Sequence, residues 1–192
     1  MKAERNIQSI QNWVKTQVSP RRFKHISGVA KTAKLLAIHH GLSVTNAVLA
    51  AWLHDCAKEL PKSEMKSWLR KSRFRLDDEE REMPGLWHPH VAASIALNKW
   101  SVRDLGVLEA IRCHTLGHPR MGSLAQLIFV ADFIEPGRKF QGVDQVRLTA
   151  KKNLTKAVSM KASMTITFLF EKRMIIHPRL LETWNIFLKV GV

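Results

Sequence analysis

His54 and Asp55 directly follow residues 47–53, a run of seven residues with almost no polarity. A helix that is apolar on every side belongs inside a core rather than on its surface. Aspartate is almost never fully buried without a partner, because burying its isolated charge is strongly unfavourable. The pair therefore either joins a dense hydrogen-bond network or holds a metal ion. The simpler alternative is a helix end that has just emerged into solvent.

Other apolar segments also carry a histidine or an aspartate near a helix end. These residues are His25, His88, His114 and Asp132. Imidazole nitrogens and carboxylate oxygens are suitable ligands for divalent metal ions, and one carboxylate can bridge two ions. The first expected site consists of His25, His54, Asp55 and Asp132. The second consists of Asp55, His88 and His114. Two ions a few ångströms apart can clamp the oxygens of a phosphoryl group.

Apolar residues spaced three and four apart predict helices along most of the chain. The expected helices cover residues 4–17, 20–40, 63–72, 86–100, 102–115 and 123–132, together with a central helix that opens at Ser43. Ser19 followed by Pro20 is a typical helix start. Residues 123–132 fit a helix or a strand, and we interpret them as a helix because no other segment resembles a strand. The expected fold class is all-α.

Several polar residues are expected outside the core. His39 and His40 lie at the polar end of their helix and should face solvent. His90 follows His88 by two residues, so the two side chains point in roughly opposite directions and His90 should be exposed or at a rim. The acidic residues 77–82 are interpreted as a solvated loop or a helix start. His177 should begin a C-terminal helix.

The chain has 192 residues, 31 Lys and Arg, and 16 Asp and Glu, which gives a formal net charge of +15. This length suits one domain over residues 1–192, divided into an N-terminal helix (1–18), a metal-binding core (19–140) and C-terminal helices (141–192). The surplus of positive charge favours an anionic partner, which could be a nucleotide, a nucleic acid or an acidic surface. The two cysteines have no framework spacing, which indicates a cytoplasmic location. No signal peptide or membrane span is expected, and a homodimer remains open.

Beyond these single residues, five longer stretches resemble a known family. They are RFKHISGVAKTAKLLA (residues 22–37), LHDCAK (53–58), HTLG (114–117), ADFIEPGR (131–138) and IHPRLLETWN (176–185). Together they are similar to the YqeK-type group of HD-domain metal-dependent phosphohydrolases. The resemblance implies an HD-domain helical bundle and a two-metal centre usually occupied by iron, with manganese, magnesium or zinc as alternatives. It also implies symmetrical hydrolysis of diadenosine tetraphosphate to two ADP.

The resemblance also implies roles for individual residues. The metal ligands would be His25, His54, Asp55, His88, His114 and Asp132. Asp55, Lys58 and Arg138 would be catalytic, and the substrate would meet Lys58, Thr115, Gly117, His118 and Arg138. Leu116 departs from the group, which tends to have a threonine there, and this bears on the choice of nucleotide.

Simpler interpretations also exist for some of these positions: Lys58 could be a surface lysine, and Arg138 could only pair with Glu135. A third residue, Glu135, could support a metal-bound histidine. In the expected mechanism, a hydroxide that bridges the metal ions attacks a phosphorus atom, and Lys58 and Arg138 stabilise the developing charge.

Two other functions remain open. The nearest alternative is a nucleoside triphosphate or other nucleotide phosphohydrolase, which product analysis would distinguish. The second is a basic, RNA-associated helical module with a vestigial site, which predicts nucleic-acid binding with a steep salt dependence. A complete ligand set argues against a vestigial site.

Overall fold

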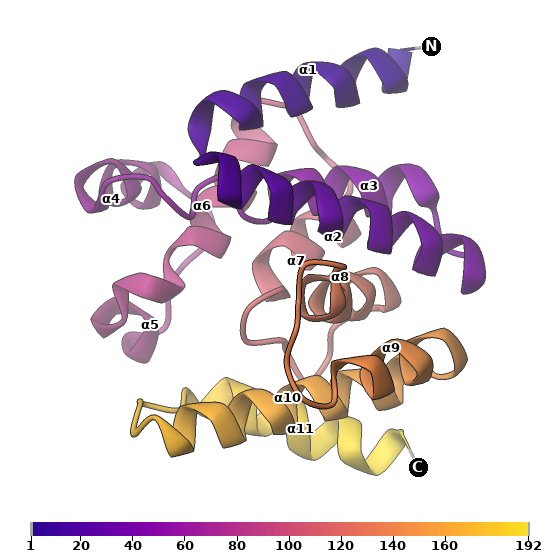
Figure 1. The fold of residues 1–192 in the computed structure, drawn as a ribbon. Coiled ribbons are helices and arrows are strands. Elements are labelled where there is room, and N and C mark those ends of the chain that lie inside the picture. The colour runs from indigo at the N-terminus through magenta and orange to yellow at the C-terminus, as the bar shows by residue number, and fades with distance from the viewer. Residues whose placement is uncertain (1, 192) are drawn as a thin grey trace.

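The computed structural model describes the backbone of residues 2–191 and the side chains of residues 7–191, so Met1 and Val192 of the expected domain lie outside it. Within this range the chain is all-helical and contains no strand, as predicted (Figure 1). The helices are α1 (Lys2–Gln17), α2 (Pro20–His39), α3 (Val44–Leu53), α4 (Lys62–Lys71), α5 (Asp78–Glu82), the 3₁₀ helix η1 (Pro84–Leu86), α6 (His88–Asn98), α7 (Leu105–Cys113), α8 (Ser123–Ile134), α9 (Val143–Lys152), α10 (Leu154–Glu171) and α11 (Pro178–Val190).

The hydrophobic core is organised around α8. Seven of its side chains are buried, and it packs against α2, α3, α7, α9 and α10. Figure 1 shows α8 end-on near the centre, with α2 and α3 above it and α9, α10 and α11 below it. Helix α3 is also strongly apolar, and its packing against α2, α7 and α8 accounts for its burial. Polar residues at the ends of these two helices are therefore brought to the middle of the molecule.

Capping residues place the starts of α2 and α3. The Ser19 hydroxyl accepts a hydrogen bond from the backbone N–H of Arg22, and Pro20 occupies the first helical position. The Ser43 hydroxyl accepts from the backbone N–H of Asn46. Both groups satisfy N–H donors that have no partner inside the helix. The helix starts predicted at these positions are confirmed.

Expectations about two polar regions were partly wrong: His40 does not face solvent, and the helix start predicted within residues 77–82 is present but is not fully solvated. His40 is half-buried, and its Nε2 donates to the carbonyl of Ala150 at 2.7 Å, whereas His39 is exposed as predicted. The acidic residues 77–82 form a capped helical turn, α5, in which Glu80 is only 2% exposed.

His90 was also expected near the surface, but it is 2% exposed and lies 2.9 Å from the Glu80 carboxylate. Arg179 of α11 reaches the same carboxylate at 2.7 Å. Residues 88–96 of α6 are all buried, because α4 and α7 pack against the helix and the Glu80 side chain of α5 contacts His90. Helical periodicity within α6 could not reveal these contacts with other helices.

The C-terminal helices pack on the core through α10. Helix α10 contacts α8 and α9, and α11 packs along α10. Figure 1 shows α10 and α11 side by side along the lower edge. The division at residues 18 and 140 remains a prediction. Among the described residues, no helix combines the length and apolar character that crossing a membrane requires.

Candidate metal centre

Helix ends deliver the predicted ligands to one place. His54 and Asp55 directly follow α3, and His114 is the C-terminal cap of α7. His88 is the first residue of α6, and Asp132 lies in the last turn of α8. The sixth residue, in the second turn of α2, is His25. The structure brings all six side chains together, and their role as metal ligands remains a prediction.

The two oxygens of Asp55 face two different groups of histidines. Oδ2 lies 3.8 Å from His25 Nε2 and 3.7 Å from His54 Nε2. Oδ1 lies 3.2 Å from His88 Nε2 and 3.3 Å from His114 Nε2. Each group gathers its ligand atoms within 4.8 Å of one another. Asp55 is therefore placed to bridge two cation sites.

Asp132 belongs to the first of these groups. Its Oδ1 lies 3.0 Å from His25 Nε2 and 3.9 Å from His54 Nε2. Asp55 and Asp132 therefore supply two carboxylates to one group, while Asp55 alone serves the other. This matches the expected division into a group with Asp132 and a group without it.

Hydrogen bonds fix the tautomer of each clustered histidine. The Nδ1 atoms of His54, His88 and His114 each lie within 2.9 Å of the backbone carbonyl three residues earlier. His25 Nδ1 lies 3.2 Å from Glu135 Oε1. Carbonyl and carboxylate oxygens only accept, so each Nδ1 carries a proton, and Nε2 is the nitrogen left for a metal ion when the imidazole is neutral. The four Nε2 atoms all lie within 3.8 Å of an Asp55 oxygen.

Charge in the cluster also suits metal binding. Burial lowers the pKa of His54 to about 4 and that of His88 to about 3, so both are neutral at pH 7. Burial opposes ionisation of Asp55 and Asp132, but neighbouring histidines, with Lys161 beside Asp132, hold both pKa values well below the usual range. Neutral imidazoles and ionised carboxylates are the forms that bind divalent metals.

Buried polar atoms without hydrogen-bond partners indicate that the cluster is suited to binding cations. His25 Nε2, His54 Nε2 and Asp55 Oδ1 are buried and have no hydrogen-bond partner among the described residues. Buried polar atoms are seldom left in this way, because losing hydration without a partner is unfavourable. The Nε2 atoms of His88 and His114 lie 3.1 Å apart. Lone pairs at this distance repel, and a cation near Asp55 Oδ1 would relieve the repulsion.

Lys58 and Arg138 lie beside different parts of the cluster, Lys58 next to His88 and Arg138 next to Asp132. Lys58 Nζ is 3.3 Å from His88 Nε2, and burial lowers its pKa. Lys58 is therefore half-buried at the cluster rather than a surface lysine. Arg138 Nη2 donates to Asp132 Oδ1 at 3.3 Å, whereas its Nε is 3.9 Å from Glu135 Oε1. Arg138 thus faces a predicted ligand as well as Glu135.

The residues after His114 occupy different environments. Thr115 Oγ1 lies 3.0 Å from His114 Nε2, so it is at the cluster. Gly117 has a φ of +70°, and a Cβ there would lie 2.6 Å from Thr183 of α11. Close packing and a left-handed backbone therefore explain this glycine.

His118 is half-buried and accepts a hydrogen bond from the backbone N–H of Arg120. Leu116 is buried in the hydrophobic core, and substrate contact by residues 117 and 118 remains a prediction.

Sequence reasoning missed Lys161 of α10, which is 4% exposed. Its Nζ donates to the carbonyls of His114 at 2.9 Å and Phe129 at 2.6 Å, and lies 3.6 Å from Asp132 Oδ2. Helix α10 therefore stabilises two elements that carry predicted ligands. The available signal was a lysine at the spacing of the buried stripe of α10, which includes Val158.

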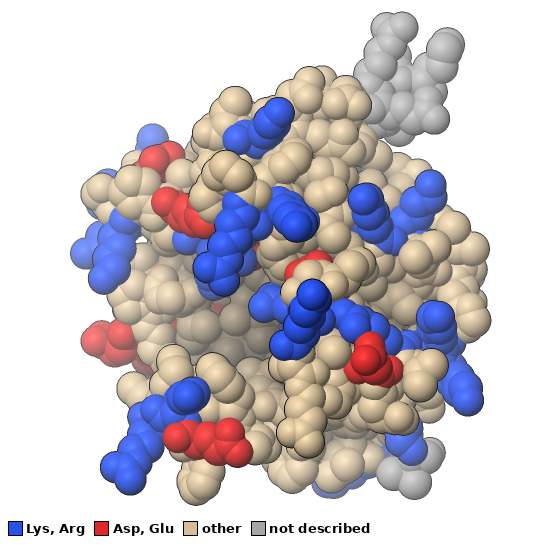
Figure 2. Space-filling view, in the orientation of Figure 1, with Lys and Arg blue, Asp and Glu red and all other residues tan. Residues whose placement is uncertain are grey.

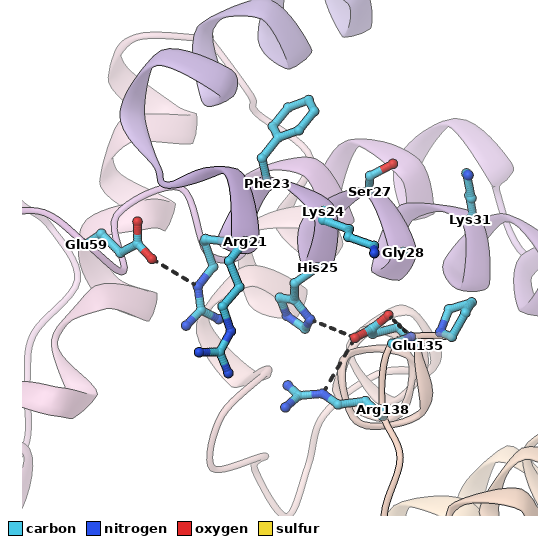
Figure 3. Close-up of a pocket in the computed structure, with 13 residues that line it drawn as sticks. Arg21, Phe23, Lys24, His25, Ser27, Gly28, Lys31, Glu59, Glu135 and Arg138 are labelled. Carbon is cyan, nitrogen blue, oxygen red and sulfur yellow. Dashed lines mark hydrogen bonds and ion pairs between the residues drawn. The ribbon is translucent and has the colours of Figure 1, made fainter.

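A cavity of about 820 Å³ opens beside His25, between the first turns of α2 and the α8–α9 loop (Figure 3). Its basic lining residues are Arg21, Arg22, Lys24, Lys31 and Arg138. The two acidic lining residues, Glu59 and Glu135, are already engaged with Ser19 and His25. The cavity is therefore suited to an anionic ligand. In Figure 2 the Lys and Arg side chains of this face lie around a hollow.

Comparison with known proteins agrees with this geometry. The HD domain family model matches residues 22–137. The symmetrical bis(5'-nucleosyl)-tetraphosphatase of Bacillus subtilis (strain 168) is 38% identical over 90% of this chain and 92% of its own length. The protein of the same description from Halalkalibacterium halodurans is 39% identical over 90% of this chain and 91% of its own.

A solved structure has the same fold. It is the crystal structure of a predicted HD superfamily hydrolase involved in NAD metabolism from Clostridium acetobutylicum, which covers 95% of this chain and 97% of its own with a TM-score of 0.90 and 33% identity. The matched region of the family model contains every residue of the histidine and aspartate cluster. The chain belongs to the HD domain family and, within it, is a homologue of the symmetrical bis(5'-nucleosyl)-tetraphosphatases.

Proposed function

We propose that this protein is a metal-dependent hydrolase that cleaves diadenosine tetraphosphate symmetrically into two ADP. One observation carries the proposal: four histidine Nε2 atoms and two carboxylates converge beside a cavity lined by basic side chains. The relatives that align over nine-tenths of the chain are described by this activity. The chemistry of the site and the substrate of the relatives therefore point the same way.

Two divalent ions fit the cluster. His25, His54, Asp55 and Asp132 would hold one ion, and Asp55, His88 and His114 would hold the other. Bound ions would lower the pKa of water and neutralise phosphate charge. Iron is the metal that we propose, with manganese, magnesium and zinc as alternatives, since imidazole and carboxylate ligands suit several of them.

The side chains of this protein would then bind and orient the polyphosphate. Arg138 from the α8–α9 loop and Lys58 from the turn after α3 would each donate to a non-bridging phosphate oxygen and stabilise developing charge. Glu135 would keep the His25 proton on Nδ1, so that Nε2 stays available as a ligand. Thr115 would add a hydroxyl at the His114 side of the site. Residues 117 and 118 would contact the nucleotide.

Product analysis tests the proposal directly. Metal-loaded protein should convert diadenosine tetraphosphate to ADP alone, because cleavage at the central linkage gives two identical products. AMP and ATP would contradict symmetrical cleavage. Faster turnover of ATP than of the dinucleotide would favour the alternative, a general nucleoside triphosphate phosphohydrolase.

Replacement of a cluster histidine tests the role of the metal. His25→Ala should lose metal and at least about 100-fold of the activity. His39→Ala, which changes an exposed histidine on the same helix, should keep both. Equal activity in the two variants would contradict the proposed centre. A cytoplasmic location and a homodimer remain predictions, for fractionation and light scattering to test.

A further inference from the structure

Two arginines of this protein have both terminal guanidinium nitrogens engaged by described residues. Arg147 donates to three backbone carbonyls at the end of α8 and the following turn, and to the carboxylate of Asp144. Arg179 pairs with the carboxylates of Asp77 and Glu80. An arginine has five N–H donors in a rigid fork and no acceptor. These two use that fork to tie segments of the fold together.

Arg22 is bound in a different way. Its Nη1 donates to Asp55 Oδ2 at 2.7 Å, while its Nε is buried and has no hydrogen-bond partner among the described residues. Glu59 Oε1 lies 3.7 Å from this Nε, too far for a hydrogen bond. The two Glu59 oxygens instead accept from the backbone N–H and the hydroxyl of Ser19. Arg22 therefore holds Asp55 through one nitrogen and keeps donors for another acceptor.

The position of Arg22 shows where that acceptor would lie. Arg22 is three residues before His25 on α2, so both side chains project from the same face of the helix. Both line the large cavity, and Arg138 lines it from the α8–α9 loop. The Arg22 side chain is 28% exposed, so its guanidinium lies between the cluster and the open cavity. A phosphate group that enters the cavity beside His25 would meet Arg22 and Arg138.

We propose that Arg22 is a substrate-binding residue, which keeps Nη1 on Asp55 and donates from its other terminal nitrogen, Nη2, to a non-bridging phosphate oxygen. This role rests on the proposed function, because it assumes a polyphosphate at this site. Arginine suits it better than lysine, since a planar fork can bind Asp55 and a phosphate oxygen together. A lysine ammonium could reach only one of them closely.

Equilibrium binding of imidodiphosphate to manganese-loaded protein tests the proposal. The P–N–P link of this probe resists hydrolysis, so the measurement does not depend on catalysis or on the nucleotide. Arg22→Lys and Arg22→Gln should each weaken binding about tenfold, as expected for loss of a charge-assisted hydrogen bond. Arg22→Lys should keep its manganese, because lysine can still pair with Asp55. Arg103→Gln is the matched control, since Arg103 is exposed and donates to a single backbone carbonyl.

Three results would overturn the proposal. If both Arg22 variants bound imidodiphosphate with the wild-type affinity, Arg22 would not contact phosphate. Loss of manganese from Arg22→Lys would show that the residue serves the cluster or the fold instead. An equal loss of affinity in Arg103→Gln would indicate a general charge effect. Failure of wild-type protein to cleave diadenosine tetraphosphate would contradict the proposed function alone, because phosphate binding is measured separately.

Discussion

Each clustered histidine has its proton held on Nδ1 by an acceptor that the fold supplies. For His54, His88 and His114 the acceptor is a backbone carbonyl three residues earlier, so the tautomer depends only on local chain geometry. His25 lies inside a helix whose carbonyls are already bonded, and it relies on the side chain of Glu135. Its orientation is therefore the most open to change by substitution.

Gly28 controls the position of Glu135. A Cβ at residue 28 would lie 2.5 Å from Glu135 Oε2, so alanine must displace the carboxylate that orients His25. We expect Gly28→Ala to weaken metal binding about 10- to 100-fold, the usual effect of losing a partner of a ligating histidine. Competition with a metallochromic chelator would measure this loss.

Gly85→Ala is the matched control, because nothing lies within 4 Å of a Cβ at that position and its backbone has no positive φ. The Gly85 variant should bind metal as the wild type does. If Gly28→Ala also kept its full metal affinity, Glu135 would have no part in orienting His25.

At the scale of elements, burial of charge links α5, α6 and α11. Burial alone would raise the pKa of Glu80, but hydrogen bonds from His90 and the Asp77 N–H, together with Arg179, lower it to about 2. Side chains from α6 and from the distant helix α11 thus meet at one carboxylate of α5. Because α6 begins with His88, this contact also fixes the helix end that carries a predicted ligand.

Removal of the Glu80 charge should therefore destabilise the fold in a pH-dependent way. The folded pKa of about 2 lies below the ordinary value of 4.5, so the carboxylate stabilises the folded state fully above about pH 4.5 and less as the pH falls toward 2. The shift corresponds to about 3 kcal/mol. Glu80→Gln should lower the unfolding free energy in urea by about this amount at pH 7, and by clearly less at pH 3.

Glu79→Gln is the control for this measurement, because Glu79 is an exposed neighbour on the same helix. Its unfolding free energy should stay close to the wild-type value at both pH values. An equal loss for Glu80→Gln at pH 7 and pH 3 would mean that packing, rather than charge, stabilises this contact.

Local signals were sufficient to predict most of the helices and the six clustered residues. Apolar runs that end in histidine or aspartate, as at His54 and Asp132, are visible within a single helix. The burial of His90 and the contacts of Lys161 depend on side chains from other helices. Such contacts arise from tertiary packing, and no pattern within one helix specifies them. The position of Arg22 likewise became interpretable only with the cavity and cluster in view.

For the whole molecule, part of the net charge of +15 lies around the cavity beside the cluster. The cavity carries five basic side chains, and its two acidic residues are engaged within the protein. Figure 2 shows blue side chains around the hollow on this face. A concave surface of one charge sign concentrates field lines and accelerates the arrival of an oppositely charged ligand. The basic surplus is therefore consistent with a polyanionic substrate and does not require nucleic acid.

This electrostatic attraction should appear as a dependence on ionic strength. Diadenosine tetraphosphate carries several negative charges, so kcat/KM should fall about tenfold between about 0.05 M and about 0.5 M salt, as screening shortens the reach of the cavity charges. The fall in kcat/KM should come from a higher KM, with kcat nearly constant, because salt screens the buried cluster much less than it screens the cavity. Bis(p-nitrophenyl) phosphate, with one charge, serves as the comparison substrate and should show a far shallower dependence. Equal salt dependence for the two substrates would mean that salt acts on the protein itself rather than on attraction of the polyanion.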